Sequence, residues 1–199
     1  EMKEQDVIYH LKIDYNKDKL LKESTETKYN SISLKTLKRY ENLLEKSKAD
    51  DPSYNFNLQS FPTFSDKDKE WFAKQTDWKI SRKVNEDPFT ETFHLHNTFK
   101  RILGLENLSP RFVTQKQGTE VHYHVDGFTT CAINFLVKGK QTPISFKDVG
   151  DFYYEVALLN TNHSHAVPKQ VEEDRILYKL RINGMTFQEA KEKLIAAAY

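Results

Sequence analysis

The chain has 199 residues, of which 38% are apolar and 30% are charged, so we expect one domain with a sizeable core. Its 30 basic and 29 acidic residues give a formal net charge of +1, so we expect neither a nucleic acid nor a membrane as partner. The single cysteine, Cys131, excludes an intramolecular disulfide, and the cytoplasm is the expected location.

Residues 1–108 are dense in charge and rich in helical patterns. Residues 7–14 alternate between apolar and polar side chains, which predicts a strand. The helices that we predict in this part cover residues 17–24, 34–48 and 93–103, and residues 65–68 resemble the start of another. We expect residues 1–108 to support a core built from the rest of the chain and to contribute its substrate side.

Residues 109–184 carry β-branched and aromatic side chains between turn-forming residues. The predicted strands cover residues 111–116, 121–126, 131–137, 143–147, 153–159, 164–167 and 175–182. Seven short strands at this spacing favour a sandwich or a barrel. Residues 185–199 predict a final helix, because Thr186 and Glu189 have the spacing of a capping box. The predicted fold is therefore α+β with a mainly β core, and residues 1–199 form a single domain.

Two pairs of histidines stand out on the predicted strands. Side chains alternate along a strand, so His122 and His124 share one face with Asp126. His163 and His165 form a second pair of this kind on a later strand. A single histidine is more often a surface or core residue than a ligand, but two such pairs and an aspartate are much less often accidental. Two imidazoles and one carboxylate can hold non-haem Fe(II) and leave coordination positions open.

Arg175 follows His165 by ten residues and opens the last predicted strand. A guanidinium pairs with a carboxylate through two parallel hydrogen bonds. Arg175 could therefore hold the far carboxylate of a 2-oxo acid that is bound to the iron. The alternative is a salt bridge between Arg175 and the acidic residues 172–174.

Three stretches of the chain resemble one known family. They read G-T-E-V-H-Y-H-V-D at 118–126, N-T-N-H-S-H-A-V at 160–167 and D-R at 174–175. They resemble the double-stranded β-helix, a jelly-roll or cupin-like fold, of the Fe(II)/2-oxoglutarate-dependent oxygenases. Within that superfamily the chain is most similar to the prolyl-hydroxylase-like and aspartyl/asparaginyl-hydroxylase-like branches. The resemblance covers about the last two-fifths of the chain, and it implies N-terminal helices packed on the outside of the β core.

The resemblance implies a role for each of the residues singled out above. His124, Asp126 and His165 would bind Fe(II) and serve as the catalytic centre. Arg175 would bind the C5 carboxylate of 2-oxoglutarate, the cosubstrate used together with O2. His163 is the rival distal ligand, and the spacing between His165 and Arg175 favours His165.

Three further residues are candidates for secondary contacts with the cosubstrate: Asn134, Gln115 and Arg111. The implied reaction is hydroxylation of a C–H bond in an amino-acid side chain, peptidyl or free, or in a related small molecule. Its coproducts would be succinate and CO2. The substrate would thus be a small molecule or a protein or peptide.

Two other functions fit part of the pattern. A cupin-type metalloenzyme that does not use 2-oxoglutarate would explain His122, His124 and a distal histidine. It would lack the glutamate expected shortly after the paired histidines, and Arg175 would have no purpose. A non-catalytic β-helix module that binds a small acid or a protein partner would keep Arg175 but need no iron.

Overall fold

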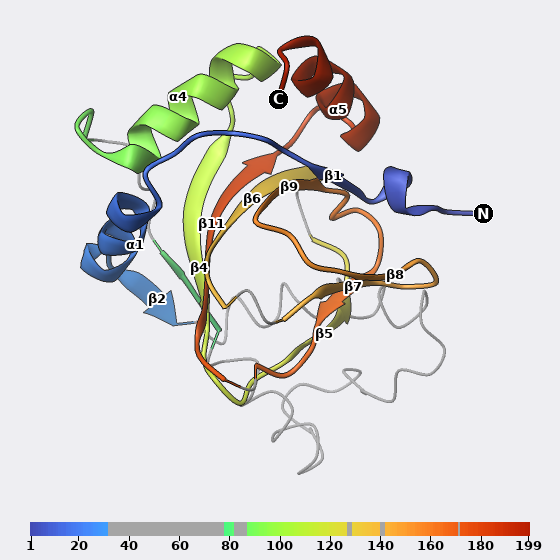
Figure 1. The fold of residues 1–199 in the computed structure, drawn as a ribbon, viewed down its shortest axis with the longest axis horizontal. Coiled ribbons are helices and arrows are strands. Elements are labelled where there is room, and N and C mark those ends of the chain that lie inside the picture. The colour runs from blue at the N-terminus through green and yellow to red at the C-terminus, as the bar shows by residue number, and fades with distance from the viewer. Residues whose placement is uncertain (32–77, 82–86, 127–128, 140–141, 171) are drawn as a thin grey trace.

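The computed structural model describes residues 1–31, 78–81, 87–126, 129–139, 142–170 and 172–199. Its strands form two antiparallel sheets (Figure 1). The larger sheet has the strand order β1 (Ile8–His10), β9 (Val156–Leu159), β6 (Cys131–Lys138), β11 (Arg175–Ile182), β4 (Ser109–Gln115), β3 (Trp78–Ser81) and β2 (Tyr29–Ser31). The smaller sheet has the order β5 (Val121–His124), β10 (His165–Val167), β7 (Ile144–Phe146) and β8 (Gly150–Phe152).

From β4 to β11 the chain passes repeatedly from one sheet to the other, with β7 and β8 as a hairpin within the smaller sheet. From β4 onward, β4, β6, β9 and β11 belong to the seven-stranded sheet, whereas β5, β7, β8 and β10 belong to the four-stranded sheet. The chain therefore winds back and forth across the gap between the sheets. This winding is that of a double-stranded β-helix, and it confirms the predicted α+β class with a mainly β core.

In the described part of the chain, three helices cover the outer face of the seven-stranded sheet (Figure 1): α1 (Lys17–Glu26), α4 (Glu91–Leu103) and α5 (Phe187–Ala196). A short 3-10 helix, η1 (Glu4–Asp6), precedes β1. The core between the helices and the sheet centres on Phe99, Phe135 and Tyr178, whose rings pack edge-on or tilted against one another. The Tyr178 hydroxyl donates to the Thr92 carbonyl of α4 over 2.8 Å, which ties the helix layer to β11.

Strand β11 lies near the middle of the larger sheet and is enclosed on both faces. Tyr178 and Leu180 point toward the helices, where they join the outer core. Leu177 belongs to a second core between the two sheets, with Phe146 among its other members. Because side chains alternate along a strand, Arg175 and Lys179 face the same inter-sheet space as Leu177. Charged side chains on an otherwise enclosed face mark this space as a site.

The structure confirms most of the predicted elements and shifts several boundaries. The helices predicted at 17–24, at 93–103 and near the C-terminus are present, and Thr186 caps α5 through the predicted capping box with Glu189. The strand predicted at 7–14 is reduced to β1, because only three residues pair with β9. The helices predicted at 34–48 and from 65–68 lie outside the described residues.

Three strands were not predicted. Strands β2 and β3 pair with each other and extend the larger sheet beside β4. Strand β8 occupies residues for which we predicted a turn, because Gly150 interrupts the apolar pattern there. The turn itself lies just before it, where Asp148 has a φ of 60°. None of the helices in the described part of the chain combines the length and the apolar character needed to cross a bilayer.

Candidate metal centre

His124 and His165 are brought together by strand pairing in the smaller sheet. His124 ends β5, His165 begins β10, and the two residues are direct partners in the antiparallel register. Directly paired residues project from the same face of a sheet. The two imidazole rings therefore lie side by side, with their centroids 4.4 Å apart.

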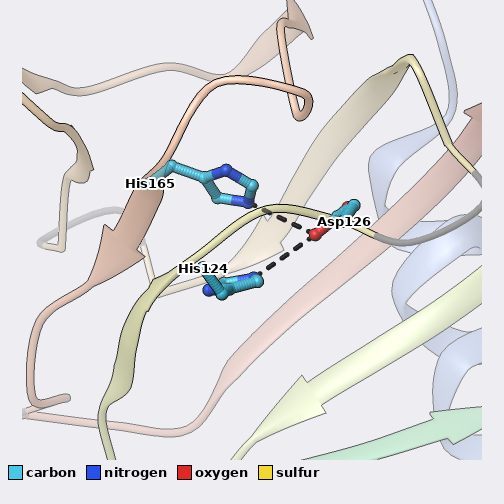
Figure 2. A group of neighbouring side chains, drawn as sticks. All are labelled: His124, Asp126 and His165. Carbon is cyan, nitrogen blue, oxygen red and sulfur yellow. Dashed lines mark ion pairs between the residues drawn. The ribbon is translucent and has the colours of Figure 1, made fainter. Parts of the chain in front are cut away.

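Asp126 joins the two histidines from the loop that follows β5. The strand was predicted to include Asp126, but it ends two residues earlier, at His124. The Asp126 backbone N–H instead donates to the Thr161 carbonyl over 3.0 Å, which fixes the loop in the turn before β10. One carboxylate oxygen, Oδ1, lies 3.3 Å from His124 Nε2 and 3.4 Å from His165 Nε2 (Figure 2).

These distances suit a single metal ion. Ligand atoms at about 2.1 Å from a metal lie roughly 3 Å apart when they occupy neighbouring coordination positions. One ligand atom from each of His124, Asp126 and His165 lies within 4.8 Å of the other two. The structure thus brings together the three residues that the sequence singled out, and their role as ligands stays a prediction.

The ring of His165 is oriented by its second nitrogen. Nδ1 donates to the His163 carbonyl over 2.8 Å, which leaves Nε2 as the acceptor that faces Asp126. Burial and the neighbouring His124 lower the pKa of His165, so the ring is neutral near pH 7 and can bind a metal. His163 itself is directed elsewhere, because its Nε2 bonds to the Lys147 carbonyl over 2.8 Å.

Lys179 contacts the carboxylate and was missed by the sequence analysis. Its Nζ lies 2.5 Å from Asp126 Oδ2, the oxygen that does not face the imidazoles. Burial by itself raises the pKa of Asp126, but Lys179 and the nearby His124 and His165 outweigh it, so this pKa lies well below its ordinary value. The sequence pointed to Lys179 only through its position, four residues after Arg175 and therefore on the same face of the same strand.

The three candidate ligands open into a cavity of about 60 Å³ between the two sheets. A cavity of this size has room for a few water-sized groups. Apolar side chains such as Val113 and Leu177 form part of its wall. Its polar lining consists of Gln115, His124, Asp126, Asn134, Thr161, His165, Arg175 and Lys179.

Arg175 is buried at this cavity, with 4% of its surface exposed. Its Nη2 donates to the Tyr154 hydroxyl over 2.9 Å, and Asn134 Nδ2 donates to the same oxygen over 3.2 Å. These two bonds fill both lone pairs of the hydroxyl, so its own proton is left to donate. Arg175 Nε has no hydrogen-bond partner among the described residues. Within that part of the chain, Arg175 also forms no ion pair with the acidic residues 172–174.

Gln115 and Asn134 also line the cavity, and their contact with a cosubstrate stays a prediction. Gln115 Nε2 donates to the Thr119 carbonyl over 2.9 Å, whereas Gln115 Oε1 has no partner in the described structure. The same holds for Asn134 Oδ1 and for the hydroxyl of Thr161. Buried polar atoms without partners are rare and are typical of places where a ligand or water binds. Arg111 does not line this cavity, and its guanidinium donates to the Pro110 carbonyl instead.

Comparisons with known proteins show likeness in structure alone. No protein-family model matches the chain, and no curated protein is similar to it in sequence. A prolyl-4-hydroxylase from Pseudomonas putida matches 77% of this chain and 91% of its own, with 10% identity and a TM-score of 0.42. An RmlC-like cupin from Desulfovibrio desulfuricans matches 38% and 74%, with 14% identity and a TM-score of 0.30.

A third solved structure belongs to the DMSP lyases RdDddP and RnDddQII. It matches 40% of this chain at 15% identity with a TM-score of 0.33, and the match spans only 41% of that lyase chain. A cupin and a prolyl-4-hydroxylase thus both occur among the structures that this chain resembles. Likeness at these identities concerns the fold and says nothing of the reaction.

Proposed function

We propose that the chain is a non-haem Fe(II)- and 2-oxoglutarate-dependent dioxygenase. It hydroxylates a C–H bond of an amino-acid side chain, peptidyl or free, or of a related small molecule. The observation that carries this proposal is a shared cavity, lined by His124, Asp126 and His165 and by the buried Arg175. Three protein ligands of this kind suit Fe(II) and leave positions open for other ligands.

The remaining residues of the cavity explain how the chain would hold the cosubstrate. Arg175 has guanidinium donors to spare, and Tyr154 has a proton to donate, so the two can bind one carboxylate together. Lys179 and Arg175 carry two positive charges against the single negative charge of Asp126. A divalent metal would raise this excess of positive charge further, so the cavity favours a dianion such as 2-oxoglutarate.

When bound, the iron and 2-oxoglutarate would supply the activation of O2, with succinate and CO2 as coproducts. The task of the chain is to hold the ligands in a fixed geometry, to anchor the cosubstrate and to keep bulk water out. The apolar wall between the sheets serves the last of these. A cupin-type metalloenzyme would use His122, His124 and a distal histidine, and it would leave Arg175 without a ligand to bind.

The proposal is tested by succinate formation from 2-oxoglutarate in air, with the purified protein and added Fe(II). We expect slow succinate formation even without the substrate that is hydroxylated. Arg175→Ala should raise the 2-oxoglutarate concentration needed for half-maximal rate on the order of 100-fold, because a buried charge loses its partner. Arg101→Ala, at an exposed position of α4, is the matched control and should change nothing.

An unchanged 2-oxoglutarate requirement in Arg175→Ala would contradict the assigned anchor. Metal binding without any conversion of 2-oxoglutarate would favour the cupin-type enzyme. Failure to bind a metal at all would favour a binding module.

A further inference from the structure

The two carboxylate oxygens of Asp126 have separate partners. Oδ1 faces both imidazoles, at 3.3 Å from His124 Nε2 and 3.4 Å from His165 Nε2. Oδ2 lies 2.5 Å from Lys179 Nζ. The side chains of Asp126 and Lys179 are each only 15% exposed, so little water competes for this ion pair. The carboxylate is thus divided into one oxygen on the imidazole side and one oxygen on the ammonium side.

Lys179 is held more firmly than the residue it contacts. It lies on β11, where its Cα is in register with Arg111 of β4 on one side and with Asn134 of β6 on the other. Asp126 lies in the loop after β5, a strand of the opposite sheet. The ion pair therefore joins the two sheets across the cavity and fixes the loop to a strand that is paired on both edges.

We propose that Lys179 is a positioning residue that makes Asp126 a ligand through Oδ1 alone. This inference rests on the metal centre of the proposed function. A carboxylate can bind a metal through one oxygen or through both. As long as the ammonium holds Oδ2, only Oδ1 is available on the side of the imidazoles. Binding through one oxygen leaves three positions of a six-coordinate metal open, whereas binding through both would leave two.

The positive charge of Lys179 acts on metal affinity in the opposite direction to its positioning of Asp126, and the experiment must separate the two effects. An ammonium near a divalent metal repels it, so its removal could tighten metal binding. The geometry favours positioning, because Lys179 contacts the oxygen remote from the imidazoles. Without Lys179, the buried carboxylate could turn and lose its preformed orientation. Loss of such a supporting contact to a metal ligand typically weakens metal binding about 10- to 100-fold.

The experiment is a titration with Co(II), whose visible absorption reports coordination and needs no turnover. Lys179→Met should weaken Co(II) binding about 10- to 100-fold and change the visible spectrum of the bound ion. Lys179→Arg keeps a cation at this place and should restore most of both properties. Arg181→Met is the matched control, because it removes a cation from the same face of β11, two residues away. It should leave the dissociation constant and the spectrum as in the parent protein.

Thermal unfolding of the metal-free variants shows whether each one folds. If Lys179→Met does not fold, Lys179→Gln replaces it, because the glutamine amide keeps a hydrogen-bond donor at this place. For Lys179→Gln we expect a Co(II) affinity lower than that of the parent but higher than that of a fully disrupted site. Equal or tighter Co(II) binding in the uncharged variant, with the parent spectrum, would overturn the inference and leave the metal centre intact. A parent protein that binds no Co(II) would overturn the metal centre, and the inference with it.

Discussion

His165 and Asp126 are each held in place by a polar atom that is not directed at the candidate metal position. His165 uses Nδ1 to donate to the His163 carbonyl, and Asp126 uses Oδ2 to pair with Lys179. Such contacts fix the orientation of a ligand before the metal binds. The sequence pattern predicted the ligand types and their shared face. It could not predict Lys179 or Tyr154, because their partners lie in segments that are distant in the sequence.

Substitution of either candidate ligand should remove metal binding. Asp126→Ala and His165→Ala each leave two of three ligand atoms, so we expect the purified protein to retain no Fe(II) after desalting, as measured by elemental analysis. His163→Ala is the matched control, because it removes an imidazole that bonds to Lys147 but keeps the carbonyl that orients His165. Retained iron in His165→Ala, together with loss in His163→Ala, would reverse the choice of distal ligand.

Cys131 should make the stability of the protein depend on pH in the alkaline range. Burial raises the pKa of its thiol from an ordinary value of 9.0 to about 12 in the folded chain. The unfolded chain therefore loses this proton first as pH rises above about 9, and the folded state loses stability by about 1.4 kcal/mol for each pH unit beyond that point.

Cys131→Ala isolates this contribution. Between about pH 8 and about pH 10, we expect the parent to lose about 1.4 kcal/mol more unfolding free energy than the variant. Urea titrations under reducing conditions measure it. A difference that stays constant over this range would show that the thiol titrates normally in the folded protein.

At the scale of elements, periodicity predicted where most strands lie but not where each one ends. Strand β5 stops at His124, because the Asp126 N–H turns to the Thr161 carbonyl instead of continuing the ladder. Strand β8 follows a turn at Asp148 and pairs with β7 over three residues, too few to give a pattern. Such boundaries depend on tertiary hydrogen bonds, which a local pattern does not contain.

The start of α5 is an element that the sequence predicted fully. The Thr186 side chain accepts from the Glu189 N–H, and the Glu189 carboxylate accepts from the Thr186 N–H over 2.7 Å. Thr186→Ala should lower the unfolding free energy by about 1 kcal/mol, which corresponds to about 2–4 °C in Tm for a chain of this size. Calorimetry measures this change.

Gln188→Ala is the control for this cap, because Gln188 is exposed on the same helix and forms no part of the cap. We expect it to change the unfolding free energy by less than about 0.5 kcal/mol. Equal Tm values for Thr186→Ala and the parent would mean that α5 does not depend on its cap.

At the scale of the whole molecule, the site exists because two sheets close over one another. The smaller sheet supplies His124 and His165, and the larger sheet supplies Arg175, Lys179, Gln115 and Asn134. Side-chain alternation predicts which residues of one strand share a face, but not which strand of the other sheet that face meets. The resemblance to a known fold supplied this information for the candidate ligands and Arg175. It did not supply the ion pair that joins the sheets.

The proposed function requires that one cavity bind both iron and 2-oxoglutarate. The most direct measurement is an anaerobic titration with Fe(II), with and without 2-oxoglutarate, that follows the weak visible charge-transfer band of an iron-chelated 2-oxo acid. We expect a band that requires both components and weakens in Arg175→Ala. Tight iron binding without such a band, in the presence of saturating 2-oxoglutarate, would contradict it.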